Sequence, residues 1–581
     1  MSKIRFIDLC AGLGGFHHGA TLASQVRGNT QFECVLASEA DDALREIYAD
    51  NFREDLEPTY KRLFPVEQCR ANPSLTDLYD DDGKLVRIHG RIEGLLGGSE
   101  AGDTEASEFL VPEHDLLCAG FPCQPFSKSG AQRGFDDDGR GTVFEMIAEI
   151  LDQRQPNYVL LENVGNFERH DDGRTWEYVR EVLSEHYHVM ATQHSVSSGG
   201  AGSGLLSPHL FGLPHHRERF FICAQHKRLR GFDQVPPFPL SYHAAPERAA
   251  RHKLRDTREA EAKAELTRIV AASQTLANED EIAKAQLTQE QLHCITHWQD
   301  LLGRLSPALG KSCMPSFPIW GFELDPWHHY PFESVDQPPF TYGEKAISSY
   351  RKRAVAKAKR LGLDPPKTGT NQATFYGRGK GPKTWFREWP AYAADRDKWP
   401  AWKVKFLHQN REWAWMVLTA FAENGELSWY RTWLDQLQQL TPSFQKLEWN
   451  CRDEELNLWD NILQFRPSGL RVKRFKHVPA LVAMTTTQIP VVPHLHDGNL
   501  PPDGLGRSRF LLPDEAKQLQ GFPRTWKVPE AHTRAFQALG NAVHAEVVSL
   551  IIRKWILGDT VDQDVTDVGG GNTQLEMFGD S

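Results

Sequence analysis

The sequence predicts an α/β fold in which a parallel sheet carries helices on both faces. Between residue 3 and about residue 225, short apolar runs of β-forming residues alternate with stretches of helical periodicity. The five apolar runs are residues 4–9, 33–37, 115–119, 158–161 and 219–224. Because parallel strands end at the same edge of their sheet, we expect a binding site at the carboxyl ends of these runs.

The composition is that of a globular protein. The chain has 581 residues, 40% of them hydrophobic, which is enough for a large core and suggests two or three lobes. No apolar stretch approaches the roughly eighteen residues that span a bilayer, and no signal-peptide core precedes the first strand, so we expect a cytoplasmic protein without a membrane partner. The nine cysteines form no Cys-x-x-Cys pair or Cys/His cluster. We therefore expect neither a disulfide scaffold nor a metal site.

The distribution of charge qualifies the net charge of −11, which by itself argues against nucleic acid as a partner. Residues 351–410 contain fifteen Lys and Arg against four Asp and Glu, whereas residues 559–581 contain six acidic residues and no Lys or Arg. A basic segment is thus set in an acidic chain. A solvated helix face would give the same pattern, so the basic segment is only supporting evidence for nucleic-acid binding.

Beyond the alternating region, the composition changes several times. Residues 78–110 are acidic and contain glycine, which predicts an inserted surface loop. Residues 245–305 are charged and rich in Ala and Leu, which predicts two or three helices. Residues 310–480 combine many Trp with basic residues and suggest a separate lobe, although most of those Trp are expected to form the core of the lobe. Helical periodicity returns between residues 510 and 552, as though the chain rejoined the first domain.

A glycine-rich turn after the first predicted strand is the candidate cofactor loop. Gly12, Gly14 and Gly15 permit a sharp turn and let a ligand approach the backbone. Glu39 ends the second apolar run, where a carboxylate can accept both ribose hydroxyls of an adenosine ligand. A dinucleotide-binding fold is the main alternative, but the spacing is not Gly-x-Gly-x-x-Gly.

Cys123 and Glu162 are the candidate catalytic pair. Cys123 follows the third strand between Pro122 and Gln124, which argues against the usual role of a Cys as a small buried hydrophobe. That bland role is expected for Cys10, Cys34, Cys118 and Cys223. A site that uses the Cys123 thiolate should lower its pKa, through a nearby Arg and backbone dipoles. Glu162 ends the fourth run, and a thiol beside an acid suits attack on a pyrimidine ring that is protonated as it is attacked.

Seven segments, in order along the chain, resemble motifs of the DNA cytosine-5 methyltransferases of bacterial restriction-modification systems. They are residues 6–15, 120–127, 140–144, 162–164, 211–219, 512–523 and 540–543. The resemblance covers residues 3–225 and 507–557, whereas between these only residues 315–320 and 466–471 are similar to segments of longer bacterial members. It implies a Rossmann-like methyltransferase domain with a mixed, mainly parallel sheet, a large inserted target-recognition lobe and a C-terminal helix that returns to the catalytic domain.

The resemblance also implies domain limits. Residues 1–230 would be the first part of the catalytic and cofactor-binding domain, residues 231–310 a helical insert, and residues 311–500 the target-recognition domain. Residues 501–558 would complete the catalytic domain, and residues 559–581 would form an acidic flexible tail.

Roles for individual residues follow from the same resemblance. Cys123 would be the nucleophile, Glu162 would act near N3 of the base, and Arg219, with Arg217, would hold the cytosine O2, a structural salt bridge being the alternative for either arginine. The residues expected at the S-adenosylmethionine cofactor are Phe6, Asp8, Gly12, Leu13, Gly14, Gly15, Glu39, Ser74, Pro122, Asn541, Ala542 and Val543.

The chain departs from the family pattern at two places. His215 stands where the family usually has Gln, and the segment around Ser74 stands where it usually has Gly-Asp-Ile, whose Asp contacts the adenine amino group. Either Ser74 or Asp77 could make that contact, and the sequence leaves both open.

The implied activity is methyl transfer to carbon 5 of cytosine in a specific double-stranded DNA sequence. The target base would leave the stack at a cost of a few kcal/mol and bond covalently to Cys123. A single chain of this kind resembles the modification enzyme of a restriction-modification system, acting at the nucleoid in the bacterial cytoplasm with a cognate restriction endonuclease as partner. A short peptide at residues 574–578 resembles those that dock bacterial sliding clamps, although a frayed acidic tail is the simpler interpretation.

Three other functions remain open from the sequence. An RNA methyltransferase would keep every catalytic residue, but its target lobe is usually more compact than the long insert here. A catalytically silent DNA-binding protein could retain the fold, although the intact segments around Cys123 and Glu162 disfavour it. A cysteine hydrolase is less well supported, because no partner His is evident near Cys123 in the strand pattern.

Overall fold

The structure is a computed structural model, and the residues that it describes form most of the predicted elements. These residues are 2–72, 75–97, 109–122, 143–191, 205–229, 248–310, 313–324, 401–452, 454–481, 488–495 and 508–558.

The chain divides into two compact units. The first comprises Met1–Leu276, Lys476–Thr486 and Leu512–Ser581, and the second comprises Ala277–Phe475 and Thr487–Leu511. The helical segment expected at residues 231–310 is therefore shared, with its first helix in the first unit and the next two in the second.

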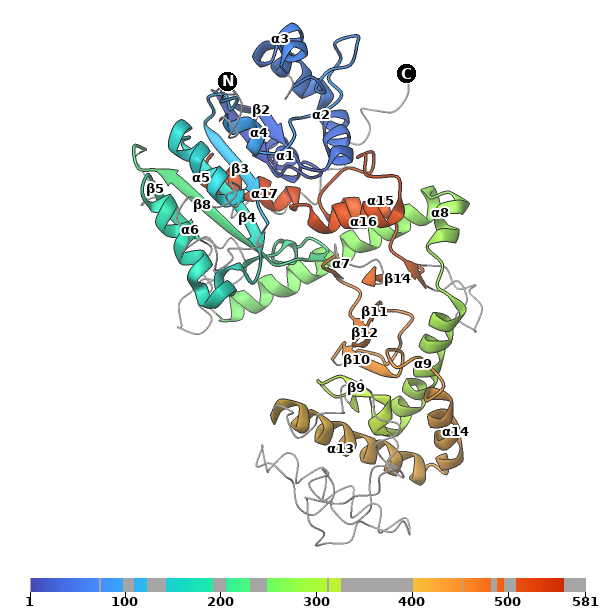
Figure 1. Ribbon diagram of the computed structural model, residues 1–581. Coiled ribbons are helices and arrows are strands. Elements are labelled where there is room, and N and C mark those ends of the chain that lie inside the picture. Colours follow the sequence, from blue (N-terminus) through green and yellow to red (C-terminus); the bar gives the residue numbers. More distant parts are fainter. Residues whose placement is uncertain are drawn as a thin grey trace, which may run out of the picture. The chain divides into compact units, whose positions relative to one another are not determined.

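The first unit contains a mixed sheet of seven strands in the order β2-β1-β3-β4-β8-β5, with β6 paired to β8 (Figure 1). Strands β1 to β4 pair in parallel, whereas β5 and β6 run antiparallel to β8 and β8 runs antiparallel to β4. The predicted α/β fold is confirmed. The strands are β1 (Ser2–Leu9), β2 (Thr30–Ser38), β3 (Leu116–Gly120), β4 (Tyr158–Val164), β5 (Tyr187–Ala191), β6 (Leu205–Leu206) and β8 (Arg219–His226).

The four parallel strands end at the same edge of this sheet. Leu9 of β1 lies opposite Ser38 of β2 and Ala119 of β3, and Gly120 lies opposite Glu162 of β4. The strand order changes direction at β1, which has β2 on one side and β3 on the other. In open α/β sheets such a switch point, outside the carboxyl ends of the strands, is where ligands bind.

Helices cover both faces of the sheet, with α5 and α6 on one face and α1 and α17 on the other (Figure 1). Helix α17 packs closely on α1, because a Cβ atom at Gly19 would lie 2.6 Å from Val548. The return of the C-terminal segment to the catalytic domain is thus observed. The helices of this unit are α1 (Gly15–Arg27), α2 (Asp42–Leu63), α3 (Val66–Ala71), α4 (Glu93–Leu96), α5 (Val143–Arg154), α6 (Arg174–Ser184), α7 (Arg248–Leu276), α15 (Pro513–Leu519), α16 (His532–Asn541) and α17 (Ala545–Trp555).

The segment expected to be an inserted surface loop is instead part of the core where it is described. Leu78, Leu85, Ile88 and Leu95 are all buried. His89 forms a parallel bridge to Ser38 at the end of β2, so this segment continues the sheet edge. The loop prediction was wrong because it was based on the acidic residues and glycines of this segment, whereas a few buried apolar side chains anchor the segment in the core.

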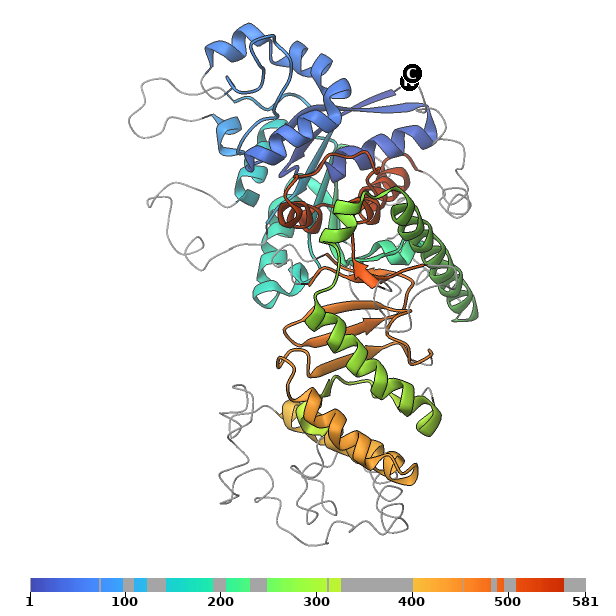
Figure 2. The same ribbon diagram turned by 90° about the vertical axis from the view of Figure 1, so that its right-hand side faces the viewer.

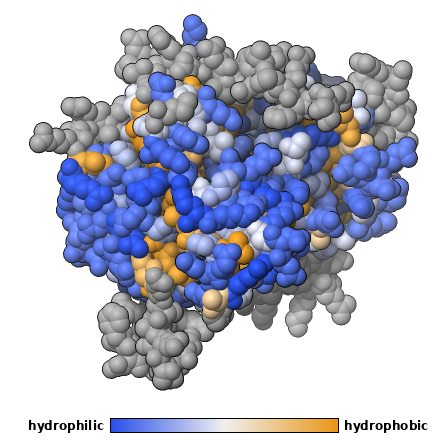
Figure 3. Space-filling view, turned by 90° about the horizontal axis from the view of Figure 1, so that it is seen from above, coloured by the Kyte–Doolittle hydropathy of each residue, from blue (hydrophilic) through white to orange (hydrophobic). Residues whose placement is uncertain are grey.

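Contrary to the expectation that no apolar stretch would be long enough to span a bilayer, one described stretch, His532–Trp555, is long and apolar enough by length and composition. Of its most apolar window, 83% is buried inside the protein, as in the core helices of a soluble protein. The face of the molecule in Figure 3 is mainly hydrophilic, with apolar side chains confined to small areas.

The second unit joins a six-stranded sheet to helices. The sheet has the order β15-β14-β11-β12-β10-β9, and its apolar face packs on α9 (Figure 2). Its helices are α8 (Glu279–Lys284), α9 (Gln289–Leu309), α13 (Ala401–Glu423) and α14 (Leu427–Leu437). Its strands are β9 (Ile319–Trp320), β10 (Lys446–Asn450), β11 (Ile462–Arg466), β12 (Gly469–Lys473), β14 (Val491–Pro493) and β15 (Ser508–Phe510). The predicted basic segment of residues 351–410 lies outside the described residues, apart from the start of α13.

A short excursion of the chain from the second unit completes the first. Strand β13 (Val478–Pro479) pairs in parallel with β7 (His215–His216), which directly precedes Arg217. Neither two-residue strand was predicted, because two residues show no periodicity.

Candidate active site

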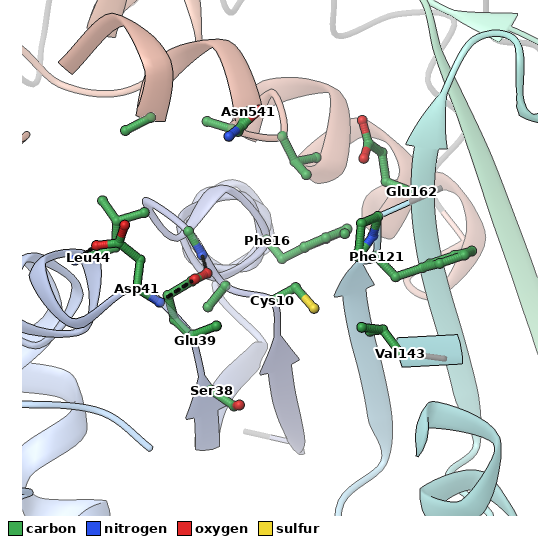
Figure 4. Close-up of a pocket in the computed structure, with 18 of the residues that line it drawn as sticks. Cys10, Phe16, Ser38, Glu39, Asp41, Leu44, Phe121, Val143, Glu162 and Asn541 are labelled. Atoms are coloured by element: carbon green, nitrogen blue, oxygen red, sulfur yellow. Dashed lines mark hydrogen bonds between the residues drawn. The ribbon is translucent and has the colours of Figure 1, made fainter. Parts of the chain in front are cut away.

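A cavity of about 580 Å³ lies at the carboxyl edge of the parallel strands in the first unit. Its walls come from the ends of β1, β2, β3 and β4 and from the last turn of α16. Glu39 and Glu162 lie on opposite sides of this cavity, with Phe16 between them and Asn541 on the helix side (Figure 4). The cavity therefore has one end marked by Glu39 and another marked by Glu162.

The glycine turn has the conformation that the sequence requires. Gly12 and Gly14 have φ values of 54° and 85°, in the left-handed region that glycine adopts without strain. Gly14 is also the N-cap residue of α1, and a Cβ atom there would lie 2.2 Å from the ring of Phe52. A Cβ atom at Gly15 would lie 2.2 Å from the carbonyl oxygen of Val543. The groups that pack closely against Gly14 and Gly15 are thus Phe52 and Val543 of the protein itself. Of the three glycines in this turn, Gly12 is the one that lines the cavity.

Glu39 holds the glycine turn in place from the end of β2. Its Oε2 accepts a hydrogen bond of 2.8 Å from the backbone N–H of Gly12, and its Oε1 accepts one of 3.0 Å from Asp41. An ionised carboxylate has about four acceptor positions, so each oxygen can still accept a second hydrogen bond. Glu39 can therefore bind two ribose hydroxyls without giving up the turn.

These features fit S-adenosylmethionine. The cavity volume is in the range of small-molecule sites, and Phe16, Leu44 and Ile92 supply apolar walls suited to an adenine ring. Among the residues that the structure describes, no group of three or more His, Cys, Asp or Glu side chains could hold a metal ion.

Glu162 and Arg219 form a buried ion pair at the other end of the cavity. Arg219 Nε lies 2.9 Å from Glu162 Oε1, and the two side chains are only 19% and 8% exposed. Within the described part of the chain, this oxygen accepts no well-aligned hydrogen bond, so the contact is mainly electrostatic. Burial raises the pKa of Glu162, and the charges of Arg219 and Arg217 partly offset the rise. The site thus favours the protonated carboxyl more than water does.

Arg217 is fixed inside the protein beside this pair. It is 2% exposed, its Nη2 donates a hydrogen bond of 2.8 Å to the carbonyl of Ala542, and its backbone N–H donates one of 2.9 Å to Ser207. Burial and the charge of Arg219 lower the pKa of Arg217. Arg217 therefore ties the segment of residues 211–219 to the segment of residues 540–543, at the cavity that both segments line.

The predicted nucleophile, Cys123, lies outside the described residues, as does Ser74. Pro122, immediately before Cys123, lines the same cavity as Glu162. Cys10, expected to be a small buried hydrophobe, is partly buried against the hydrophobic core and also lines this cavity. Burial and the nearby carboxylate of Glu39 raise the pKa of the Cys10 thiol to about 12, so it stays protonated.

The structure brings together nine of the predicted residues at the cavity wall: Gly12, Glu39, Pro122, Glu162, Arg217, Arg219, Asn541, Ala542 and Val543. Five others do not line it: Phe6, Asp8, Leu13, Gly14 and Gly15. Phe6 and Asp8 lie two residues apart on β1 and share a buried face, where Asp8 accepts a 3.0 Å hydrogen bond from the hydroxyl of Tyr48. Leu13 is fully buried. These residues shape the loop and lie outside the wall of the cavity.

Sequence reasoning missed two parts of the wall. Arg91, Ile92 and Glu93 line the cavity next to Glu39. Asp77, proposed as an alternative to Ser74, does not line it and instead pairs with Arg45 at 2.7 Å. A short apolar pattern around Ile88 and Ile92 is the one signal that could have identified this segment.

The second missed wall joins distant parts of the chain. Arg534 of α16 pairs with Asp41 at 2.6 Å, and both line the cavity. Asp41 also caps α2, because its Oδ1 accepts hydrogen bonds from the backbone N–H groups of Ala43 and Leu44. No sequence pattern marks a pair separated by 493 residues.

Comparison with known proteins gives consistent matches. The sequence profile of the C-5 cytosine-specific DNA methylases matches residues 4–66, 99–356 and 427–556. The chain is 28% identical to the Type II methyltransferase M.AluI of Cellulosimicrobium cellulans over 605 aligned positions, which cover 98% of this chain and 95% of that protein. It is 33% identical to the Type II methyltransferase M.HhaI of Haemophilus parahaemolyticus over 243 positions, 42% of this chain and 55% of that protein.

A solved methyltransferase structure from Entamoeba histolytica matches with a TM-score of 0.38 and 10% identity, over 96% of this chain and 99% of that one. The sequence profile covers most of the chain, in the order of the motifs that form the cavity. The chain belongs to the C-5 cytosine-specific DNA methylase family, DNA cytosine-5 methyltransferases that use S-adenosylmethionine as methyl donor.

Proposed function

We propose that this chain methylates carbon 5 of cytosine within a specific double-stranded DNA sequence, through a covalent bond between Cys123 and a base turned out of the duplex. The observation that carries the proposal is one cavity with Glu39 at one end and Glu162, Arg219 and Pro122 at the other. This arrangement sets an adenosine-binding carboxylate opposite a raised-pKa acid, with the candidate thiol one residue beyond the wall.

Each residue has a defined task in the reaction. Cys123, as thiolate, forms a bond to carbon 6 while Glu162 gives a proton to N3, so that the electron pair displaced from the ring reaches carbon 5. Arg219 holds the cytosine O2 and keeps Glu162 oriented. S-adenosylmethionine, once bound, supplies the methyl group that carbon 5 takes. Loss of the carbon 5 proton to a base, for which water is one candidate, then expels the Cys123 thiolate and re-forms the C5–C6 double bond. N3 returns its proton to Glu162, which restores the neutral aromatic ring and the acid.

The raised pKa of Glu162 supports its role as the acid. A carboxyl group with an ordinary pKa is almost fully ionised at neutral pH, and the upward shift of the Glu162 pKa makes its protonated form more available. The remaining cofactor and base contacts are assigned to the residues that line the cavity. In this proposal, residues 1–230 and 501–558 carry out catalysis and residues 311–500 select the target sequence.

Methyl transfer from labelled S-adenosylmethionine to duplex DNA is the direct test. The wild-type chain should label duplex DNA and not total tRNA, and Cys123→Ala should abolish transfer. Transfer that survived in Cys123→Ala would overturn the covalent scheme. DNA containing 5-fluorocytosine should trap the wild-type chain as a stable adduct, which a catalytically silent DNA-binding protein would not form. Bisulfite sequencing of DNA from expressing cells would then give the target base and its context.

The biological setting is proposed from the relatives, whose names identify them as Type II methyltransferases. The chain would act at the nucleoid in the bacterial cytoplasm as the modification enzyme of a restriction-modification system with a cognate endonuclease. The absence of an endonuclease gene beside its gene would argue against this setting. A sliding clamp is a further proposed partner, through residues 574–578, which lie outside the described residues. Clamp capture that was unchanged by deletion of residues 572–581 would remove it.

A further inference from the structure

Helix α7 is the part of the helical insert that belongs to the first unit, where it lies against α15 (Figure 1). It also contacts the short 3-10 helix η2 (Pro208–Phe211), which leads into the segment of residues 211–219. The buried side chains of α7 recur at intervals of three and four residues, so one face of the helix is packed on the unit. They are Ala262, Leu266, Ile269 and Val270.

The turn at Gly212 is the place where α7 meets this segment. Gly212 ends η2 with a φ of 84°, in the left-handed region that favours glycine. A Cβ atom at this position would overlap Oε2 of Glu261 and lie 3.3 Å from Cδ of Arg258, both on α7. Nη1 of Arg258 donates a hydrogen bond of 2.8 Å to the same oxygen of Glu261, and the two side chains are only 14% and 35% exposed. A partly buried ion pair of α7 is therefore packed directly on the turn.

A second ion pair joins α7 to strand β13, which lies beside the same segment. Oε1 of Glu259 lies 2.6 Å from Nζ of Lys476, two residues before β13. Strand β13 pairs with β7, and the ring of His477 lies 5.5 Å from the ring of His216 in β7. Glu259 thus supports β13, and Glu261 supports the turn that precedes β7. Because a pairing of two short strands is only marginally stable by itself, this support from α7 matters.

The supported segment carries the two arginines of the candidate site. Arg217 follows β7 directly, and Arg219 begins β8, where it pairs with Glu162. Only six residues separate Gly212 from Arg219, so a displaced turn can displace the guanidinium. A misplacement of about 1 Å at a reacting centre can cost about 10²-fold in rate. The position of the turn therefore bears on the chemistry.

We propose that Arg258 and Glu261 are positioning residues for methyl transfer, which fix the turn at Gly212 and thereby place Arg219 against Glu162 and the target base. This inference rests on the proposed function and adds to it a role for the helical insert. Neither Arg258 nor Glu261 lines the cavity, so their effect on the reaction passes through Arg219.

The test is methyl transfer by Glu261→Ala, which removes the carboxylate that packs on the turn. Turnover should fall by about 10-fold, since the displacement of Arg219 is expected to be a fraction of 1 Å. The KM for S-adenosylmethionine should stay unchanged. Because Arg219 lowers the pKa of Glu162, a loosened contact should also move the alkaline limb of the single-turnover rate to higher pH. Glu261→Gln keeps an oxygen for Arg258 and should retain most of the turnover.

Asp256→Ala is the matched control. It also removes a carboxylate of α7 that pairs with an arginine, Arg255, but both side chains are exposed. It should change neither the turnover nor the pH profile. Hydrogen exchange adds a measurement that does not depend on activity. In Glu261→Ala, the backbone amides of residues 213–219 should exchange faster than in the wild type, whereas those of β3 should not.

The possible failures are distinguishable. Unchanged turnover and an unchanged pH profile in Glu261→Ala, with an active wild type, would overturn the positioning role alone. Equal losses of turnover and of S-adenosylmethionine affinity would indicate general damage to the fold and would also contradict it. Absence of methyl transfer to DNA by the wild type would instead overturn the proposed function, and the exchange measurement would still show whether Glu261 supports the turn.

Discussion

The carboxylate of Glu162 and the guanidinium of Arg219 lie 2.9 Å apart on the neighbouring antiparallel strands β4 and β8. The pKa of Glu162 is therefore subject to two opposing effects. Burial favours the protonated carboxyl of Glu162, and Arg219 favours the ionised form. Both residues lie on paired strands, so the distance between the carboxylate and the guanidinium is set by the sheet. The opposing effects of burial and of Arg219 on the pKa of Glu162 are therefore set by the fold.

Substitution of Glu162 should separate catalysis from cofactor binding. Glu162→Gln removes the proton donor but keeps the size of the side chain, so turnover should fall by about 10²–10⁴-fold. The affinity for S-adenosylmethionine, measured by calorimetry, should stay close to that of the wild type. Glu177→Gln, at an exposed position on α6, is the control and should change neither quantity.

Substitution of Arg219 should change the pH dependence as well as the rate. In Arg219→Gln the positive charge that lowers the pKa of Glu162 is lost, so this pKa rises further. The protonated acid should then persist to higher pH, and the alkaline limb of the single-turnover rate should move upward in pH. The rate itself should fall by about 10²–10³-fold through loss of a charged contact to the base. An alkaline limb that stayed in place would show that Glu162 is not the titrating acid.

A pair of glycine substitutions tests the packing of α17 on α1. Gly19→Ala would put a methyl group 2.6 Å from Val548 and should lower stability by about 1–3 kcal/mol. Gly303→Ala, inside α9, meets no atom within 4 Å and should raise stability by about 0.5–1 kcal/mol, because Ala is the better helix former. Thermal melts should therefore shift in opposite directions for the same chemical change.

Glu546 should make stability depend on pH near neutrality. It lies in the first turn of α17, where burial and the carboxylate of Glu265 raise its pKa to about 7 and Arg268 partly offsets this. Between pH 4.5 and 7 the unfolded chain ionises at this residue and the folded protein does not, so stability falls as pH rises through this range. Glu546→Gln should remove that fall, and its melting temperature should exceed the wild-type value at pH 8 more than at pH 5.

A matched pair at Asp41 distinguishes helix capping from the ion pair. Asp41→Asn keeps an oxygen that can cap α2 but loses the charge facing Arg534, and an exposed pair of this kind contributes only about 0.2–1 kcal/mol. Asp41→Ala also loses the cap, which adds about 1 kcal/mol. Both should weaken S-adenosylmethionine binding, since Asp41 lines the cavity. Equal melting temperatures for the two variants would exclude the capping role.

The parts of the site that could be predicted are those with local signals. The apolar runs before Cys10, Glu39 and Glu162 defined strands, and parallel strands bring their ends to one edge. The glycine turn was expected to let a ligand approach its backbone, and at Gly15 the structure shows a close approach by the carbonyl of Val543.

The remainder depends on contacts without a local pattern. Arg91 and Ile92 reach the cavity because a segment rich in polar residues is anchored by a few buried side chains. The pairing of β13 with β7 involves two residues on each side, which is too short for any periodicity. Such features follow from the tertiary packing, which single-sequence patterns do not encode.

The first unit is assembled from three stretches that are separated along the chain. The last of these stretches supplies part of the cavity wall, including Asn541. During synthesis at the ribosome, the strands of this unit emerge hundreds of residues before α17, which must cover α1. The face of the nascent sheet that carries α1 is therefore only partly covered while the whole second unit is translated. An engineered circular permutation that joined residues 508–558 ahead of residue 2 should shorten this interval and reduce aggregation during expression.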